Sequence, residues 1–225
     1  METINEKDLK ADPLAPPAIP PGKSKILVGI SNFFSGVFLP LLVPTYAFAT
    51  ALWVTSLSML PERLRLFSSA LIFIITTIPP LVTILFLMRK GKVKDVSIND
   101  PKDRPIPYLV TIVSYFVAAF FLREWPHWIP MFFMGAAVAA IIASLITFRW
   151  KISAHATSMG GFTALLIYIG IHNLETVMII PWIAVAIFCS GAVGSARIYL
   201  GRHTPAQVYA GWLLGLIMDY IFMCI

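Results

Sequence analysis

Charged residues are scarce in this chain: Asp, Glu, Lys and Arg make up only 12% of its 225 residues. A typical soluble domain carries about 25%. Hydrophobic residues make up 58% of the chain, and the length is sufficient for one domain. This composition excludes an ordinary soluble globular protein and indicates a polytopic membrane protein.

Cysteine is equally scarce, and the two present, Cys189 and Cys224, both lie in apolar segments. The sequence therefore offers neither a disulfide framework nor a cysteine-based metal site. The formal net charge is +6, which suits anionic lipid headgroups or phosphates. No soluble basic face is evident, so we expect no nucleic-acid partner. The N-terminus lacks the charged start and short apolar core of a signal peptide, and we expect none to be cleaved.

Long apolar stretches predict an all-α transmembrane helical bundle of six to seven spans. Residues 1–24 are polar and proline-rich and predict a disordered tail, which leaves residues 25–225 as the transmembrane domain. Residues 25–36 predict an interfacial or re-entrant helix. The spans are expected at residues 39–59, 66–88 with a kink at Pro79 and Pro80, 107–122, 128–148, 156–171, 177–197 and 205–225.

Alternating span directions place the loops after the second, fourth and sixth spans on the same side as the N-terminal tail. These loops carry three polar clusters, at residues 102–105, 151–155 and 197–203. Three distant stretches thus converge on one membrane face, and they predict a composite site there. Most lysines and arginines also lie on this side, so the positive-inside rule predicts that the active face is cytoplasmic.

The third cluster belongs to the most informative stretch, residues 195–215, which reads SARIYLGRHTPAQVYAGWLLG. Charge at the edge of a bilayer is costly unless it has a function or a partner. A turn at Gly201 and a helix beginning at Pro205 would bring Arg197 and His203 together. A guanidinium and an imidazole near a helix N-terminus predict a phosphate site.

This stretch resembles the third signature of the type 2 phosphatidic acid phosphatase (PAP2) superfamily: Ser-Arg, five residues, His, three residues, Asp. Arg197 and His203 keep the spacing, whereas Ala196 replaces the serine and Gln207 replaces the aspartate.

The other two clusters carry weaker versions of the family's motifs. The sequence KISAH, residues 151–155, resembles Pro-Ser-Gly-His through Ser153 and His155. Taken alone, that pair is more typical of a helix cap beside a solvated imidazole. Arg104 and Pro105 match the end of Lys, six residues, Arg-Pro. The motif lysine is absent, and Lys102 or Lys94 is the candidate replacement, with a plain basic loop as the alternative.

The resemblance implies a PAP2/chloroperoxidase-like helical core and phosphatase chemistry. It implies that His203 attacks phosphorus to form a phosphohistidine, while His155 protonates the departing alkoxide and later activates water. The phosphate ligands expected on this basis are Arg197, Arg104, Lys102, Ser153 and Lys151. No metal or other cofactor is expected, because these side chains supply the positive charge.

Gln207 follows His203 by four residues and is expected on the same helical face. Its side-chain oxygen can accept the hydrogen bond that the family's aspartate accepts from the imidazole, although the negative charge is lost. We therefore expect slower hydrolysis. Further along this helix, Gly211 and Gly215 predict a packing face. Asp219, about 18 Å from Gln207 by helical rise, is expected near the far interface.

The sequence leaves three functions open. The first is a lipid phosphate phosphatase that acts on a prenyl pyrophosphate, phosphatidate, phosphatidylglycerol phosphate or a lipid A phosphate. The second is a lipid phosphotransferase, and the third is a catalytically degenerate protein that binds or moves phospholipids. The expected partners are a phosphorylated lipid and the bilayer, and the expected location is a bacterial inner membrane. The oligomeric state does not follow from the sequence.

Overall fold

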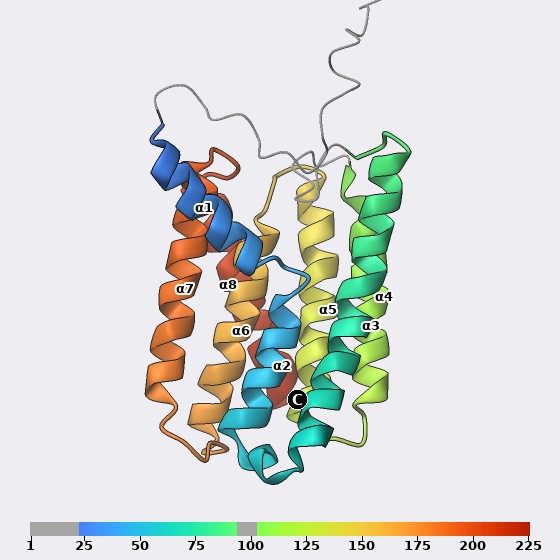
Figure 1. Cartoon of the computed structure of the whole chain (residues 1–225), viewed down its shortest axis with the longest axis vertical. Coiled ribbons are helices and arrows are strands. Elements are labelled where there is room, and N and C mark those ends of the chain that lie inside the picture. The colour runs from blue at the N-terminus through green and yellow to red at the C-terminus, as the bar shows by residue number, and fades with distance from the viewer. Residues whose placement is uncertain (1–22, 94–102) are drawn as a thin grey trace, which may run out of the picture.

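The computed structural model describes residues 23–93 and 103–225, which form a bundle of α-helices (Figure 1). Strands are absent from these two ranges, so the predicted all-α class is confirmed. Apart from residues 23 and 24, the predicted N-terminal tail lies outside the described residues. The helices are α1 Lys25–Val37, α2 Val43–Val54, α3 Glu62–Arg89, α4 Pro105–Phe121, α5 Trp128–Thr147, α6 Ala154–Ile171, α7 Ile180–Tyr199 and α8 Pro205–Cys224.

Five of these helices, α3, α5, α6, α7 and α8, are long and apolar enough to cross a membrane. The helix α4 is also apolar but has 17 residues. Large apolar side chains cover the outside of the bundle, as shown by the exposed Ile74, Leu109 and Phe188. Such an exterior suits lipid rather than water. The chain is therefore a multi-pass membrane protein, as predicted.

The first predicted span, residues 39–59, is wrong in its bounds. Only α2, with 12 residues, is α-helical there, and a short 3-10 helix at Ser56–Met59 follows it. Between α1 and α2 the chain leaves the helix around Pro40, which has no backbone N–H to donate, and Pro44 lies in the first turn of α2. In Figure 1, α1 lies obliquely over α7 at one end of the bundle and α2 continues toward the other end.

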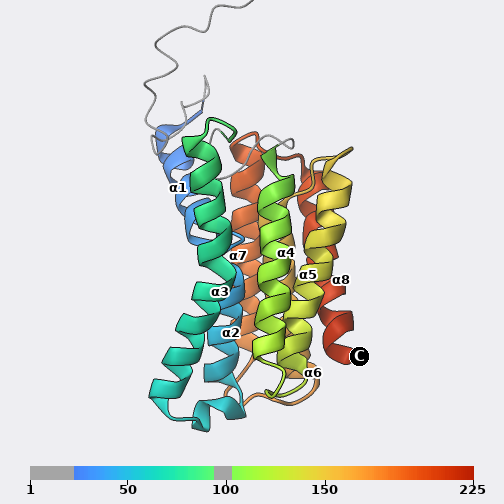
Figure 2. The same ribbon diagram turned by 90° about the vertical axis from the view of Figure 1, so that its right-hand side faces the viewer.

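The other predicted spans agree with the helices to within four residues at each end. Pro79 and Pro80 lie inside α3, and the helix bends in its middle, as predicted (Figure 2).

The most extensive contact between described helices is that of α6 with α8, and glycines make their close approach possible. A Cβ atom at Gly211 would lie 2.7 Å from the Ser153 carbonyl oxygen, and one at Gly160 would lie 2.9 Å from the Leu216 backbone nitrogen. The predicted packing face at Gly211 and Gly215 is therefore confirmed. Because the two helices begin at the same end of the bundle, this contact brings the residues at their N-termini together.

Candidate active site

The end of α3, the start of α4 and the connections α5–α6 and α7–α8 all lie at one end of the bundle (Figure 1). A cavity of about 290 Å³ begins there and is lined by Arg104, His155, Arg197 and His203. All four side chains are buried. Arg104 precedes α4, His155 lies in the first turn of α6, Arg197 lies in the last turn of α7, and His203 lies in the α7–α8 loop. The structure thus brings together four of the eight predicted site residues.

The α7–α8 loop fixes His203 through a tight turn. Gly201 has a φ of +70°, which glycine adopts without strain, and the backbone N–H groups of Arg202 and His203 both bond to the Arg197 carbonyl. The His203 Nδ1 atom lies 3.3 Å from the carbonyl oxygen of Lys151. A carbonyl oxygen only accepts, so Nδ1 carries the proton and Nε2 of the neutral ring keeps its lone pair.

The surroundings of His203 also favour the neutral ring. Burial lowers the pKa of His203 most, and the nearby charges of Arg197, Arg104 and Lys151 lower it further, to about 4. The hydrogen bond to the Lys151 carbonyl opposes this change. At neutral pH the imidazole is therefore unprotonated, which is the form that acts as a nucleophile.

The helix α1 holds His155 in place, and nothing in the sequence had indicated that α1 lies near the site. Its Nε2 atom lies 3.2 Å from the carbonyl oxygen of Ser35 in α1, and this carbonyl can only accept the Nε2 proton. The helix α1 thus closes over the imidazole of His155. A backbone carbonyl has no sequence signature, so this contact was not predictable from residue types.

The buried arginines supply the positive charge of the site. The Arg104 guanidinium donates a hydrogen bond of 3.2 Å to the Ile152 carbonyl, which ties α4 to the α5–α6 loop. Arg197 is only 3% exposed, although it carries a full charge. Lys151 is not among the cavity-lining residues, but its charge acts on His203. The predicted ligand Lys102 lies outside the described residues. The cations that line the cavity suit an anionic group such as phosphate.

Two predicted site residues have a different role in the structure. The Ser153 hydroxyl caps α6 by accepting the N–H of Ala156 at 3.4 Å, and Ser153 does not line the cavity. The side-chain oxygen of Gln207 accepts the N–H of Thr204 at 3.1 Å, as part of a capping box at the start of α8. The geometry therefore does not support Ser153 as a phosphate ligand or Gln207 as the partner of His203. The Lys151 carbonyl orients the imidazole instead.

Asp219 does not lie at the far interface, and that prediction is wrong. The residue is 2% exposed and lines the cavity together with Tyr115. Distance along α8 alone was misleading, because the cavity extends from the histidines deep into the bundle. The available signal was the presence of an ionisable residue within an apolar span, which by default indicates a functional site.

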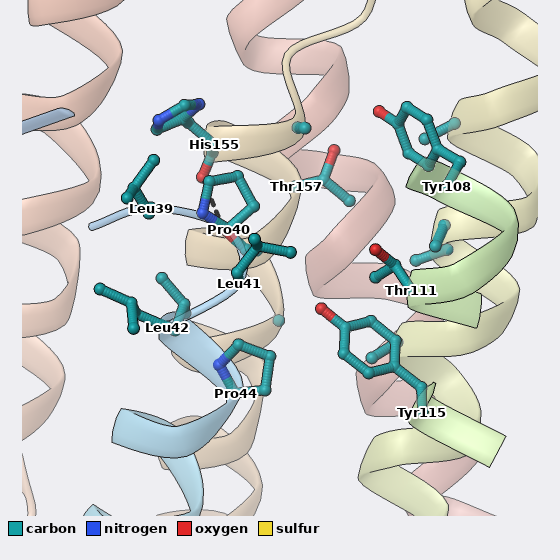
Figure 3. A pocket seen from close by; sticks show the side chains of 18 of the residues that line it. Leu39, Pro40, Leu41, Leu42, Pro44, Tyr108, Thr111, Tyr115, His155 and Thr157 are labelled. Atoms are coloured by element: carbon teal, nitrogen blue, oxygen red, sulfur yellow. Dashed lines mark hydrogen bonds between the residues drawn. The ribbon is translucent and has the colours of Figure 1, made fainter. Parts of the chain in front are cut away.

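The cavity is more polar on one wall than on the other (Figure 3). Residues 39–44, the connection between α1 and α2, form an apolar wall. Opposite them, the hydroxyl groups of Tyr108, Thr111 and Tyr115 on α4 point into the cavity. His155 and Thr157 on α6 also line the cavity. The cavity therefore suits a molecule that has a charged head, a polar segment and an apolar remainder.

The fold and the site define a polytopic helical membrane protein with two histidines and two arginines at one end of an internal cavity. Residues 146–225 match the family model of the PAP2 superfamily. This match confirms the resemblance for the part of the chain that holds α6, α7 and α8, and with them His155, Arg197 and His203. A match to this family suggests phosphatase-type activity, often on lipid phosphates. No curated protein and no solved structure matches the chain at a significant level.

Proposed function

We propose that this protein is a lipid phosphate phosphatase that hydrolyses a phosphomonoester or pyrophosphate of a lipid through a phosphohistidine on His203. The observation that carries the proposal is the shared cavity, where His155, His203, Arg104 and Arg197 meet at one end and apolar side chains continue beyond them. The headgroup would lie at the arginines, and the hydrocarbon would extend along the apolar wall.

The first step transfers the phosphoryl group to the protein. The lone pair on Nε2 of His203 attacks phosphorus while the bond from phosphorus to the lipid oxygen breaks. The bound phosphate favours the cationic form of His155, which gives the departing alkoxide a proton and becomes neutral. Arg104 and Arg197 stabilise the negative charge on the phosphoryl oxygens in the transition state.

The second step returns the protein to its starting state. A water molecule gives a proton to His155 and attacks the phosphohistidine, which releases inorganic phosphate and restores the lone pair on His203. The Lys151 carbonyl supports both steps, because it keeps Nδ1 protonated and Nε2 directed away from the loop.

We further propose that the active end faces the cytoplasm of a bacterial inner membrane. In the described ranges this end carries the larger number of basic residues: Lys23, Lys25, Arg89, Lys90, Lys92, Arg104, Arg149, Lys151, Arg197 and Arg202. The opposite end carries Arg63, Arg65 and Arg123. The positive-inside rule favours the end with more lysine and arginine for the cytoplasm.

The proposed function is tested by phosphate release from a panel of lipid phosphates, with the purified protein in detergent and EDTA present. Wild type is expected to release phosphate, and His203→Asn is expected to lose the activity by about 10⁴-fold or more. His172→Asn, an exposed histidine at the opposite end, is the matched control and should retain activity. Radiolabelled phosphate should be trapped on wild type and not on His203→Asn.

Two results would overturn the proposal. Equal activity of wild type and His203→Asn would remove the phosphohistidine mechanism. Transfer of phosphate to an added acceptor lipid, without free phosphate, would show that the protein is a phosphotransferase.

A further inference from the structure

The deep end of the cavity holds a polar group that the proposed chemistry does not use. Asp219 on α8 lines the cavity and is 2% exposed, and its Oδ1 atom has no hydrogen-bond partner within residues 23–93 and 103–225. Buried polar atoms are almost always hydrogen-bonded, and an unsatisfied carboxyl in an apolar interior is costly. A side chain of this kind beside a cavity points to a ligand that supplies the partner.

The surrounding helices are shaped to hold the Asp219 carboxyl. A Cβ atom at Gly135 on α5 would lie 3.1 Å from Oδ1, and one at Gly161 on α6 would lie 3.0 Å from Cγ. The carboxyl therefore occupies space that exists only because both positions are glycine. Tyr115 on α4 is within electrostatic range of Asp219, and its hydroxyl points into the cavity (Figure 3). The helices α4, α5, α6 and α8 therefore all border the Asp219 carboxyl.

The distance of the Asp219 carboxyl from the histidine end of the cavity can be measured along α6. Gly161 follows His155 by six residues, so the carboxyl lies about 9 Å from the level of the imidazole at 1.5 Å per residue. An extended chain advances about 1.2 Å per bond, so this depth corresponds to roughly seven bonds from the phosphoester oxygen. In a diacylglycerol phosphate, the two ester carbonyl oxygens lie about five and six bonds from that oxygen, just short of this depth. In a prenyl phosphate, only hydrocarbon lies there.

We infer that Asp219 and Tyr115 bind the ester carbonyl groups of a diacylglycerol phosphate, which makes phosphatidate-like lipids the substrate class rather than prenyl phosphates. This inference rests on the phosphatase function proposed above. A carbonyl oxygen only accepts, so the Tyr115 hydroxyl donates to it. Asp219 donates as well in its neutral acid form, the form that costs least in an apolar interior.

The test compares two lipids that differ only in the carbonyl oxygens. Purified wild type in detergent is given a diacylglycerol phosphate and its diether analogue of equal chain length, with a polyprenyl monophosphate as a third substrate. We expect kcat/KM to be about tenfold or more higher for the diacyl lipid than for the diether, because the diether leaves buried donors unpaired. The kcat/KM for the polyprenyl monophosphate should be as low as that for the diether.

The variants assign this preference to the deep end of the cavity. Asp219→Leu and Tyr115→Phe should both bring the diacyl-to-diether ratio close to one. Asp219→Asn should keep part of the preference, because its amide still donates. The matched control is Thr163→Val: this hydroxyl is fully buried on α6, bonds to the Met159 carbonyl and does not line the cavity. Its ratio should equal that of wild type.

The possible outcomes separate the two proposals. If wild type releases phosphate from none of the three lipids, the phosphatase function itself is refuted. If wild type cleaves the diacyl and diether lipids equally well, the phosphatase function stands and the role of Asp219 is overturned. Should Asp219→Leu fail to fold, Tyr115→Phe decides, since it removes only one oxygen atom. If folded Tyr115→Phe keeps the wild-type ratio of diacyl to diether kcat/KM, the inference is overturned.

Discussion

The contact between α6 and α8 determines where the two histidines lie, and Gly160→Ala is the change that tests it. A Cβ atom at this position would meet the Trp212 carbonyl oxygen and would lie 2.9 Å from the Leu216 backbone nitrogen. Both obstacles are backbone atoms, so no side-chain rotation relieves them. Ordinary contact begins at 3.4 Å, and the Trp212 carbonyl oxygen is the nearer of the two obstacles, so α8 must move away from α6 by about 1 Å or more.

The expected cost has two parts. Overpacking of this kind destabilises a protein by about 1–3 kcal/mol, and the helical preference of alanine over glycine returns about 0.5–1 kcal/mol. We therefore expect a net loss of about 1–2 kcal/mol in the free energy of unfolding. The displacement also separates His155 from His203. Because a misplacement of about 1 Å in reacting groups costs on the order of 10²-fold in rate, phosphate release should fall by about tenfold or more.

The assay compares Gly160→Ala with Gly191→Ala, in thermal unfolding in detergent and in phosphate release. Gly191 lies on the exposed side of α7, and a Cβ atom there would have no neighbour within 4 Å. This control should unfold at the wild-type temperature or slightly above it, with wild-type activity. If Gly160→Ala and Gly191→Ala cannot be distinguished in either measurement, the helix contact does not position the site.

Two further predictions concern the charge of the nucleophile and the orientation of the chain. The imidazole signal of His203, assigned by its loss in His203→Gln, should titrate near pH 4, because burial and neighbouring cations disfavour the protonated ring; a midpoint at or above 6.5 would contradict the described surroundings. In a variant with Cys189 and Cys224 replaced by serine, Arg149→Cys places a thiol on the exposed α5–α6 loop. An impermeant thiol reagent should leave it unlabelled in intact cells, and labelling from outside would reverse the proposed topology.

The helices themselves follow closely from the sequence. Hydropathy located α4 to α8 within a few residues, because each of those segments is apolar, is bounded by polar or proline residues and hydrogen-bonds its backbone internally. The region of α1 and α2 was harder to predict. A continuous apolar stretch gives no indication of where a helix ends, and the break near Pro40 divides a length that hydropathy reads as a span.

The site illustrates what spacing can and cannot specify. Arg104, His155, Arg197 and His203 were recognisable because charged side chains are costly in apolar surroundings and their spacing matched known motifs. The capping roles of Ser153 and Gln207 could not be recognised in the same way. A hydroxyl or an amide can cap a helix or bind a ligand, and only the local geometry shows which of the two it does.

The sequence by itself determined the membrane class, most of the helices and the four charged or imidazole side chains that line one end of the cavity. Only the tertiary structure decided which backbone carbonyls hold the two histidines and that Asp219 borders the same cavity. The physical reason for the first is that every residue has the same backbone carbonyl, so the residue type does not show which carbonyl binds a histidine. The reason for the second is that the depth of a residue in a bundle depends on how neighbouring helices pack, not on distance along one helix. Those two properties arise only when the helices come together.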